Sequence, residues 1–135
     1  MTPLDFAWRH IGDVVTAPGG LGGECVDLAN LWLMEGYGLG HVWANAVQWQ
    51  YAKIRHFTWE PNTPMNMPIP GSLVVWQQQA DWHIGPNGHI AMALSASRLY
   101  LVTFDQNWPE GALTPSSRLR EVIGELNAVI AVMLR

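Results

Sequence analysis

The sequence predicts a single α+β domain over residues 1–135, in which helices come first and an antiparallel sheet follows. The length of 135 residues is that of one ordinary domain with a single core. Apolar residues recur at helical spacing up to about residue 54, whereas apolar runs typical of strands occur only after residue 71. This segregation favours an antiparallel sheet over alternating βαβ units.

The first predicted helix begins at Thr2 and Pro3, which fit a capping residue and a proline at the first helical position. Three apolar residues at helical spacing follow: Leu4, Trp8 and Ile11. A glycine-rich loop over residues 17–23 comes next, and it has too much conformational freedom for a regular element.

The central helix is expected to begin at Cys25 and to end among Gly36, Gly38 and Gly40. Apolar residues at positions 25, 28, 29 and 32 form one face. The polar residues are expected on the opposite side: Glu24, Asp27 and Asn30. A third helix is predicted over about 45–54.

Four prolines between residues 61 and 70 predict a long connection without a helix. The strands expected after it cover residues 72–76, 88–94, 99–105 and 128–134.

Composition excludes several classes of partner. Charged residues make up 13% of the chain and the formal net charge is -4, so there is no basic surface for nucleic acid or an anionic membrane. No apolar run approaches the ~20 residues that span a bilayer, and the amino terminus lacks the layout of a secretory signal. We therefore expect a monomer that binds neither nucleic acid nor membrane.

Cys25 is the only cysteine, so it cannot form an internal disulfide. Free cysteine is often buried as a small hydrophobe, and packing is the plain alternative for it. Its place at a helix start favours the thiolate instead, because unpaired N–H groups and the helix dipole stabilise an anion there. Cys25 is therefore a candidate nucleophile.

Among five histidines, His89 is the candidate base because it opens an apolar strand after Asn87 and Gly88. If this strand and the next form a hairpin centred near residue 97, the residue opposite His89 is Asp105. A carboxylate there would fix the imidazole tautomer and stabilise the imidazolium. Asn107 shares a face with Asp105 by the two-residue period, so either could orient the ring.

A zinc site is the alternative for the same region. Asp81, His83 and His89 are close in sequence and could meet Cys25 as ligands. Their spacing does not match a compact ligand pair, and we expect no metal and no cofactor.

Four segments in this order resemble CHAP domains, the cysteine/histidine-dependent amidohydrolase/peptidases. They are Gly22 to Leu28, Pro70 to Trp76, Gly88 to Met92, and Asp105 to Trp108. The resemblance runs from about Leu4 to the last strand. It implies a papain-like fold with N-terminal helices packed on a C-terminal antiparallel sheet, and hydrolysis of peptidoglycan as in phage endolysins and bacterial autolysins.

The resemblance also implies residue roles. Cys25 would attack an amide carbonyl, His89 would take the thiol proton and later protonate the leaving amine, and Asp105 or Asn107 would orient His89. The thioester would then be hydrolysed by water, and the Cys25 backbone N–H would stabilise the oxyanion. Four residues are expected to line the substrate cleft, with core packing as the alternative for at least two of them: Trp43, Asn45, Trp76 and Trp108.

Three departures limit what can be carried over. Asp105 stands where some members have glutamate. Glu24 stands where many relatives have glutamine, a possible second oxyanion donor, so that donor stays open. Residues 16–23 contain no carboxylate, so we expect no calcium site in this loop.

The resulting expectation is an amidase or endopeptidase with bacterial peptidoglycan as partner, without a separate wall-binding domain. It would act alone or within a larger lysin or assembly. It would be made in the host cytoplasm without a signal peptide and act on the cell wall after release. The alternative is an inactive wall-binding or structural module of the same fold.

Overall fold

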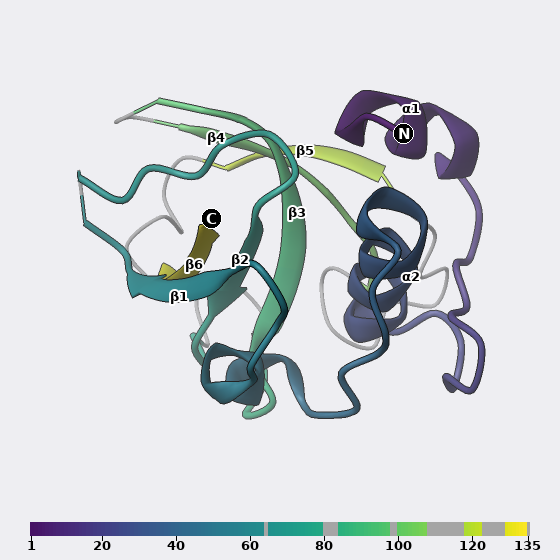
Figure 1. Cartoon of the computed structure of the whole chain (residues 1–135), viewed down its shortest axis with the longest axis horizontal. Coiled ribbons are helices and arrows are strands. Elements are labelled where there is room, and N and C mark those ends of the chain that lie inside the picture. The colour runs from purple at the N-terminus through teal and green to yellow at the C-terminus, as the bar shows by residue number, and fades with distance from the viewer. Residues whose placement is uncertain (64, 80–83, 98–99, 108–117, 123–128, 135) are drawn as a thin grey trace.

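The structure is a computed structural model that describes residues 1–63, 65–79, 84–97, 100–107, 118–122 and 129–134. It contains a six-stranded sheet of strand order β1-β6-β2-β3-β4-β5 in which every described pair is antiparallel. The helices α1 (Pro3–His10) and α2 (Cys25–Tyr37) lie together beside β3, as Figure 1 shows. The predicted α+β class and its antiparallel sheet are confirmed.

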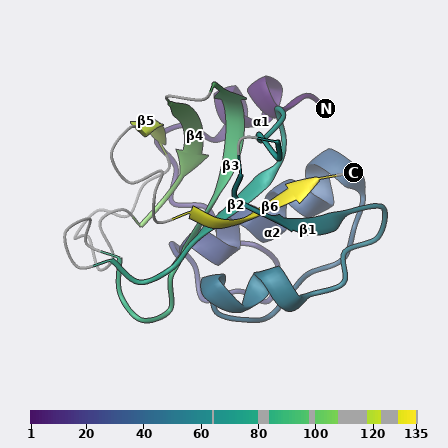
Figure 2. The ribbon, with the colours of Figure 1, turned by 90° about the vertical axis from the view of Figure 1, so that its left-hand side faces the viewer.

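Four strands match the predicted segments: β2 (Leu73–Trp76), β3 (His89–Ala96), β4 (Leu101–Asp105) and β6 (Val129–Leu134). Two were not predicted, and both lie at the edges of the sheet: β1 (Thr58–Pro61) and β5 (Arg118–Val122). Figure 2 shows β1 beside β6. Because β1 is only four residues long and ends on a proline, its sequence carries little of the alternation that marks a strand.

The core lies on both faces of the central strands. Leu73 and Val75 belong to the cluster that packs against the helices, whereas Val74 and Trp76 belong to a second cluster. Successive residues of a strand point to opposite faces, so β2 is buried on both sides. The two layers fix the position of the neighbouring strand β3, which begins at His89.

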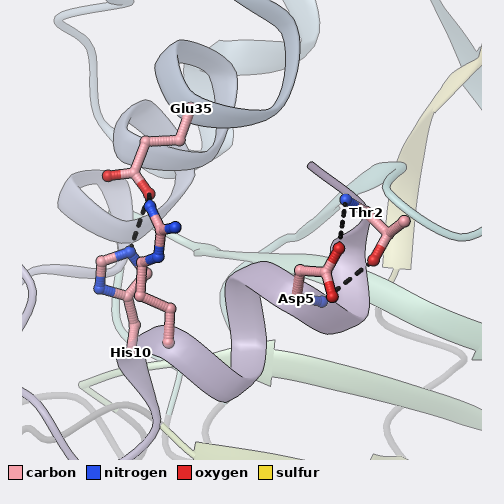
Figure 3. Close-up of polar contacts among 5 residues, drawn as sticks. Thr2, Asp5, His10 and Glu35 are labelled. Atoms are coloured by element: carbon pink, nitrogen blue, oxygen red, sulfur yellow. Dashed lines mark hydrogen bonds and ion pairs between the residues drawn. The ribbon is translucent and has the colours of Figure 1, made fainter.

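The amino-terminal helix α1 has the predicted cap. Thr2 N–H donates to the Asp5 carboxylate at 3.2 Å, and Asp5 N–H donates to the Thr2 hydroxyl at 3.1 Å (Figure 3). His10 at the other end forms a 2.9 Å contact with Glu35, which ties α1 to α2. The apolar stripe that predicted this helix is not its buried face, however, since Leu4 and Trp8 are exposed and Phe6 and Ala7 are buried.

Helix α2 begins at Cys25 as predicted and runs to Tyr37, with Gly38 in the left-handed conformation just after it. The expected polar face was wrong, because Asp27 and Asn30 are both buried. Asn30 exchanges two hydrogen bonds with the backbone of Val42, at 2.8 and 3.0 Å. A polar side chain that is hydrogen-bonded in this way can be buried, because its polar atoms keep their partners.

The third predicted helix is a shorter 3₁₀ helix, η1 (Ala46–Tyr51). None of the helices in the described ranges is long and apolar enough to cross a bilayer.

Candidate active site

The loop before α2 is fixed by Asp27, a residue whose role the sequence analysis missed. Its carboxylate accepts hydrogen bonds from three backbone N–H groups of this loop, at 3.0 to 3.2 Å: Ala17, Gly22 and Glu24. A Cβ on Gly20 would lie 1.9 Å from Asp27 Oδ1, so only glycine allows the loop to pass so close. Cys25 is thereby held at the first position of the helix. The signal for Asp27 was its place in the first helical turn, where acidic residues bind free N–H groups.

Gln106 was also missed, and it connects the end of β4 to the same loop. Its side-chain amide exchanges two hydrogen bonds with the backbone of Val15, both at 2.9 Å, and also donates to the Glu24 carbonyl at 2.8 Å. Gln106 is buried and lies next to Asp105 in sequence. The contact therefore sets the spacing between the strand that holds Asp105 and the helix that holds Cys25.

Replacing Gln106 with alanine is expected to lower the free energy of unfolding by about 2–4 kcal/mol, because the backbone groups of Val15 and Glu24 lose buried partners. Denaturant unfolding measures this loss. Gln77→Ala, at an exposed position, is the matched control and should change stability by less than ~0.5 kcal/mol. Equal midpoints for the two variants would show that Gln106 does not hold the loop.

His89 lies at the first residue of β3, directly after Gly88. Gly88 has a φ of +72°, and a Cβ there would lie 2.4 Å from the Trp76 carbonyl oxygen. This tight approach turns the chain into β3. The indole of Trp76 then packs against the imidazole of His89, with ring centroids 5.4 Å apart. His89 is 3% exposed, so its ring is held by packing as well as by hydrogen bonds.

The predicted contact between His89 and Asp105 is present. His89 Nε2 donates to Asp105 Oδ2 at 2.7 Å, and the carboxylate is fully buried. The predicted register was wrong by two residues, since Met92 pairs with Phe104 and continuation of that pairing places Asn107 opposite His89. Asp105 is thus the diagonal neighbour of His89. The two side chains lie on the same face of the sheet, because a register shift of two residues does not change the face.

The thiol of Cys25 forms a hydrogen bond with His89. Because Nε2 is bound to Asp105, Nδ1 is the ring nitrogen left for the thiol. Burial alone would lower the pKa of His89, but the hydrogen bonds to Asp105 and Cys25 and the negative charges of both groups raise it to about 9. At neutral pH His89 is therefore an imidazolium.

This raised pKa predicts a pH-dependent stability. In the folded protein the pKa of His89 is about 9, whereas its ordinary value is 6.5. The contribution of protonated His89 to the free energy of unfolding is therefore fully present below pH 6.5 and is lost as the pH rises through 9. The free energy of unfolding is expected to fall by roughly 3 kcal/mol across this pH range. Denaturant unfolding at pH 6 and pH 9.5 should show this extra loss in the wild type but not in His89→Gln. Parallel pH dependences in the two proteins would contradict the shifted pKa.

Asn107 contacts the residue before Cys25: its Nδ2 donates to Glu24 Oε2 at 3.2 Å. Its φ is +58°, a left-handed conformation that is uncommon outside glycine and is found at functional sites. Of the two residues predicted to orient His89, Asp105 contacts the ring, and Asn107 lines the hollow that holds Cys25 and His89.

The cleft is a hollow of about 210 Å³ whose lining includes both Cys25 and His89. Asn45 and Asn107 also line it. A second hollow shares Leu21, Glu24 and Asn45 with the first and extends to Trp43, whose side chain is 54% exposed. The two hollows adjoin at these shared residues, and together they are called the groove below.

The expected cleft role of Trp76 is wrong, because this side chain has no exposed surface and packs behind His89. Trp108 lies outside the described residues.

The residues of the alternative metal site do not all fall in the described part of the chain, because Asp81 and His83 lie outside it. Within the described residues no group of three or more histidine, cysteine and acidic side chains is placed to hold a metal ion. The Asp27 carboxylate contacts the 16–23 loop, and backbone N–H groups donate to its oxygens. Those donors stand where a calcium ion would require oxygen ligands.

The fold and the groove define the class of the protein: an α+β, papain-like fold in which a cysteine at a helix start meets a histidine at a strand start. A family model described as the CHAP domain matches residues 15–107. The chain belongs to the CHAP domain family.

Solved structures with the same fold include the crystal structure of a wild-type endolysin, LysIME-EF1, with a TM-score of 0.76 and 21% identity over 98% of this chain and 62% of that chain. The crystal structure of Ly7917 matches with a TM-score of 0.66 and 18% identity, over 98% of this chain and 60% of that one. This chain thus spans about three fifths of the length of these neighbours. No curated protein sequence matches it.

Proposed function

We propose that this chain is a cysteine amidase or endopeptidase that hydrolyses an amide bond in the peptides of bacterial peptidoglycan. The observation that carries the proposal is the hydrogen-bonded line from Cys25 through His89 to Asp105, at the side of an open groove. Membership of the CHAP family and a fold shared with an endolysin support the choice of substrate.

The first step is attack of the Cys25 thiolate on the carbonyl carbon of the scissile amide. The oxyanion that forms is stabilised by the Cys25 N–H, since the first N–H groups of a helix have no partner within the helix. His89 then gives its proton to the leaving nitrogen, and the C–N bond breaks. An amine departs and the acyl group remains on Cys25 as a thioester.

The second step is hydrolysis of the thioester. His89, now neutral, takes a proton from water, and the hydroxide formed attacks the thioester carbonyl. The carboxylic acid leaves, the thiolate is regenerated and His89 is again an imidazolium. Throughout the cycle Asp105 accepts a hydrogen bond from Nε2–H and so holds the ring in the orientation that both steps require.

Digestion of purified peptidoglycan followed by mass spectrometry tests this proposal. The expected products carry one new amino group and one new carboxyl group, and no new reducing sugar ends. The fragment masses will identify whether the sugar–peptide amide, a stem-peptide bond or a cross-bridge is cut. Sedimentation of the protein with cell walls without any cleavage would favour the alternative of an inactive binding module.

A further inference from the structure

We propose that Glu24 selects substrates that carry an ammonium group beside the scissile amide. This inference rests on the proposed function and assigns a substrate class to the same groove. Glu24 directly precedes Cys25, is exposed, and lines both hollows of the groove. A charged group at this place lies next to any peptide whose amide reaches the thiol.

The backbone of Glu24 is held on both sides. Its N–H donates to Asp27 Oδ2 at 3.2 Å, and its carbonyl accepts from Gln106 Nε2 at 2.8 Å. Its side chain is positioned by Asn107, whose Nδ2 donates to Oε2 at 3.2 Å. The carboxylate is therefore fixed at the rim of the groove, with little conformational entropy left to lose when a substrate binds.

Glu24 has no lysine or arginine partner among the described residues of the groove. Asn107, its hydrogen-bond donor, is uncharged. The described residues that line the two hollows include no lysine and no arginine. Asp27 is the other acidic residue there, and its oxygens are occupied by backbone N–H groups. His89 is the one group there that gains a positive charge, and it lies between Cys25 and Asp105.

A negative rim without a protein cation attracts a positive group of the ligand and disfavours a negative one. The matching chemistry is a primary ammonium, either a free amino terminus or the side-chain amine of a diamino acid. A neutral peptide would leave the Glu24 carboxylate near the developing oxyanion with His89 as the counter-charge for both, which slows its cleavage.

The test compares three preparations of purified peptidoglycan: untreated, N-acetylated, and reductively dimethylated. Acetylation removes the positive charge of amines and dimethylation retains it. The wild type is expected to cleave the untreated and dimethylated material at least ~10-fold faster than the acetylated material. In Glu24→Gln the three rates should agree within about 2-fold, because glutamine keeps an acceptor for Asn107 but loses the charge.

Glu60→Gln is the matched control. Glu60 lies on β1, three strands away from β3, and the same change in net charge there should leave the preference of the wild type intact. Circular dichroism checks that each variant is folded. An independent measurement on the wild type alone is the salt dependence, because added salt should reduce the preference for charged material.

Equal cleavage of acetylated and untreated material by the wild type, or an unchanged preference in Glu24→Gln, would overturn the role of Glu24 and leave the proposed function intact. Failure to cleave any of the three preparations in a Cys25-dependent manner would overturn both. A preference lost in Glu24→Gln and kept in Glu60→Gln supports the inference.

Discussion

Cys25→Ala is expected to abolish the release of new amino groups from purified peptidoglycan while the protein remains folded. The thiol is the one group in the line with His89 and Asp105 that can form a covalent bond to the substrate carbonyl. Loss of a covalent nucleophile typically lowers kcat by about 10⁴-fold or more. Cys25 is only partly buried, so the smaller alanine side chain removes few core contacts.

Thermal unfolding monitored by circular dichroism separates loss of chemistry from loss of fold. We expect the variant to unfold within a few degrees of the wild type. Wild-type protein alkylated with iodoacetamide at neutral pH should be equally inactive, because alkylation removes the same nucleophile. Retained cleavage by a folded Cys25→Ala protein would show that the thiol is not the nucleophile.

Asp105→Asn is expected to have the second largest effect. The substitution retains the size of the side chain but lets the amide donate to His89 Nε2, which favours the wrong tautomer. We expect kcat to fall by ~10³- to 10⁴-fold. Since Asp105 raises the pKa of His89 towards 9, the alkaline limb of the pH–rate profile should also move to lower pH in the variant.

Thr103→Val is the matched control for Asp105→Asn. Thr103 lies on the same strand two residues earlier and is fully buried, and its hydroxyl has no hydrogen-bond partner among the residues that the structure describes. This variant should retain the rate and the pH profile of the wild type. If Asp105→Asn keeps the wild-type alkaline limb while Asn107→Ala shifts it, then Asn107 and not Asp105 orients the ring.

The local features of the site were largely predictable from the sequence. A capping residue and a proline predicted the start of α1, and the loop glycines predicted the start of α2 at Cys25. The contact between His89 and Asp105 was predicted from a hairpin register that is wrong by two residues, and the contact is still present because a shift of two residues leaves Asp105 on the same face.

The features that depend on tertiary packing were not predictable. Asp27 and Asn30 have polar side chains, and only the way in which the loops before and after α2 fold back onto them makes their burial favourable. The same holds for Gln106, whose partners lie 82 and 91 residues away. Leu4 and Trp8 on α1 show the opposite error, because they were expected on the buried face and are exposed. Helical spacing shows which residues share a face, but it does not show whether another part of the protein packs against that face.

The most direct test of the proposed mechanism is to trap the acyl group carried by Cys25 with a second nucleophile. Peptidoglycan digestion is run with increasing hydroxylamine, and the acyl product is analysed by mass spectrometry. A thioester on Cys25 partitions between water and hydroxylamine, so the account predicts a growing fraction of hydroxamate in the wild type and none with Cys25→Ala. Free carboxylic acid alone at every hydroxylamine concentration, or hydroxamate formed by Cys25→Ala, would contradict it.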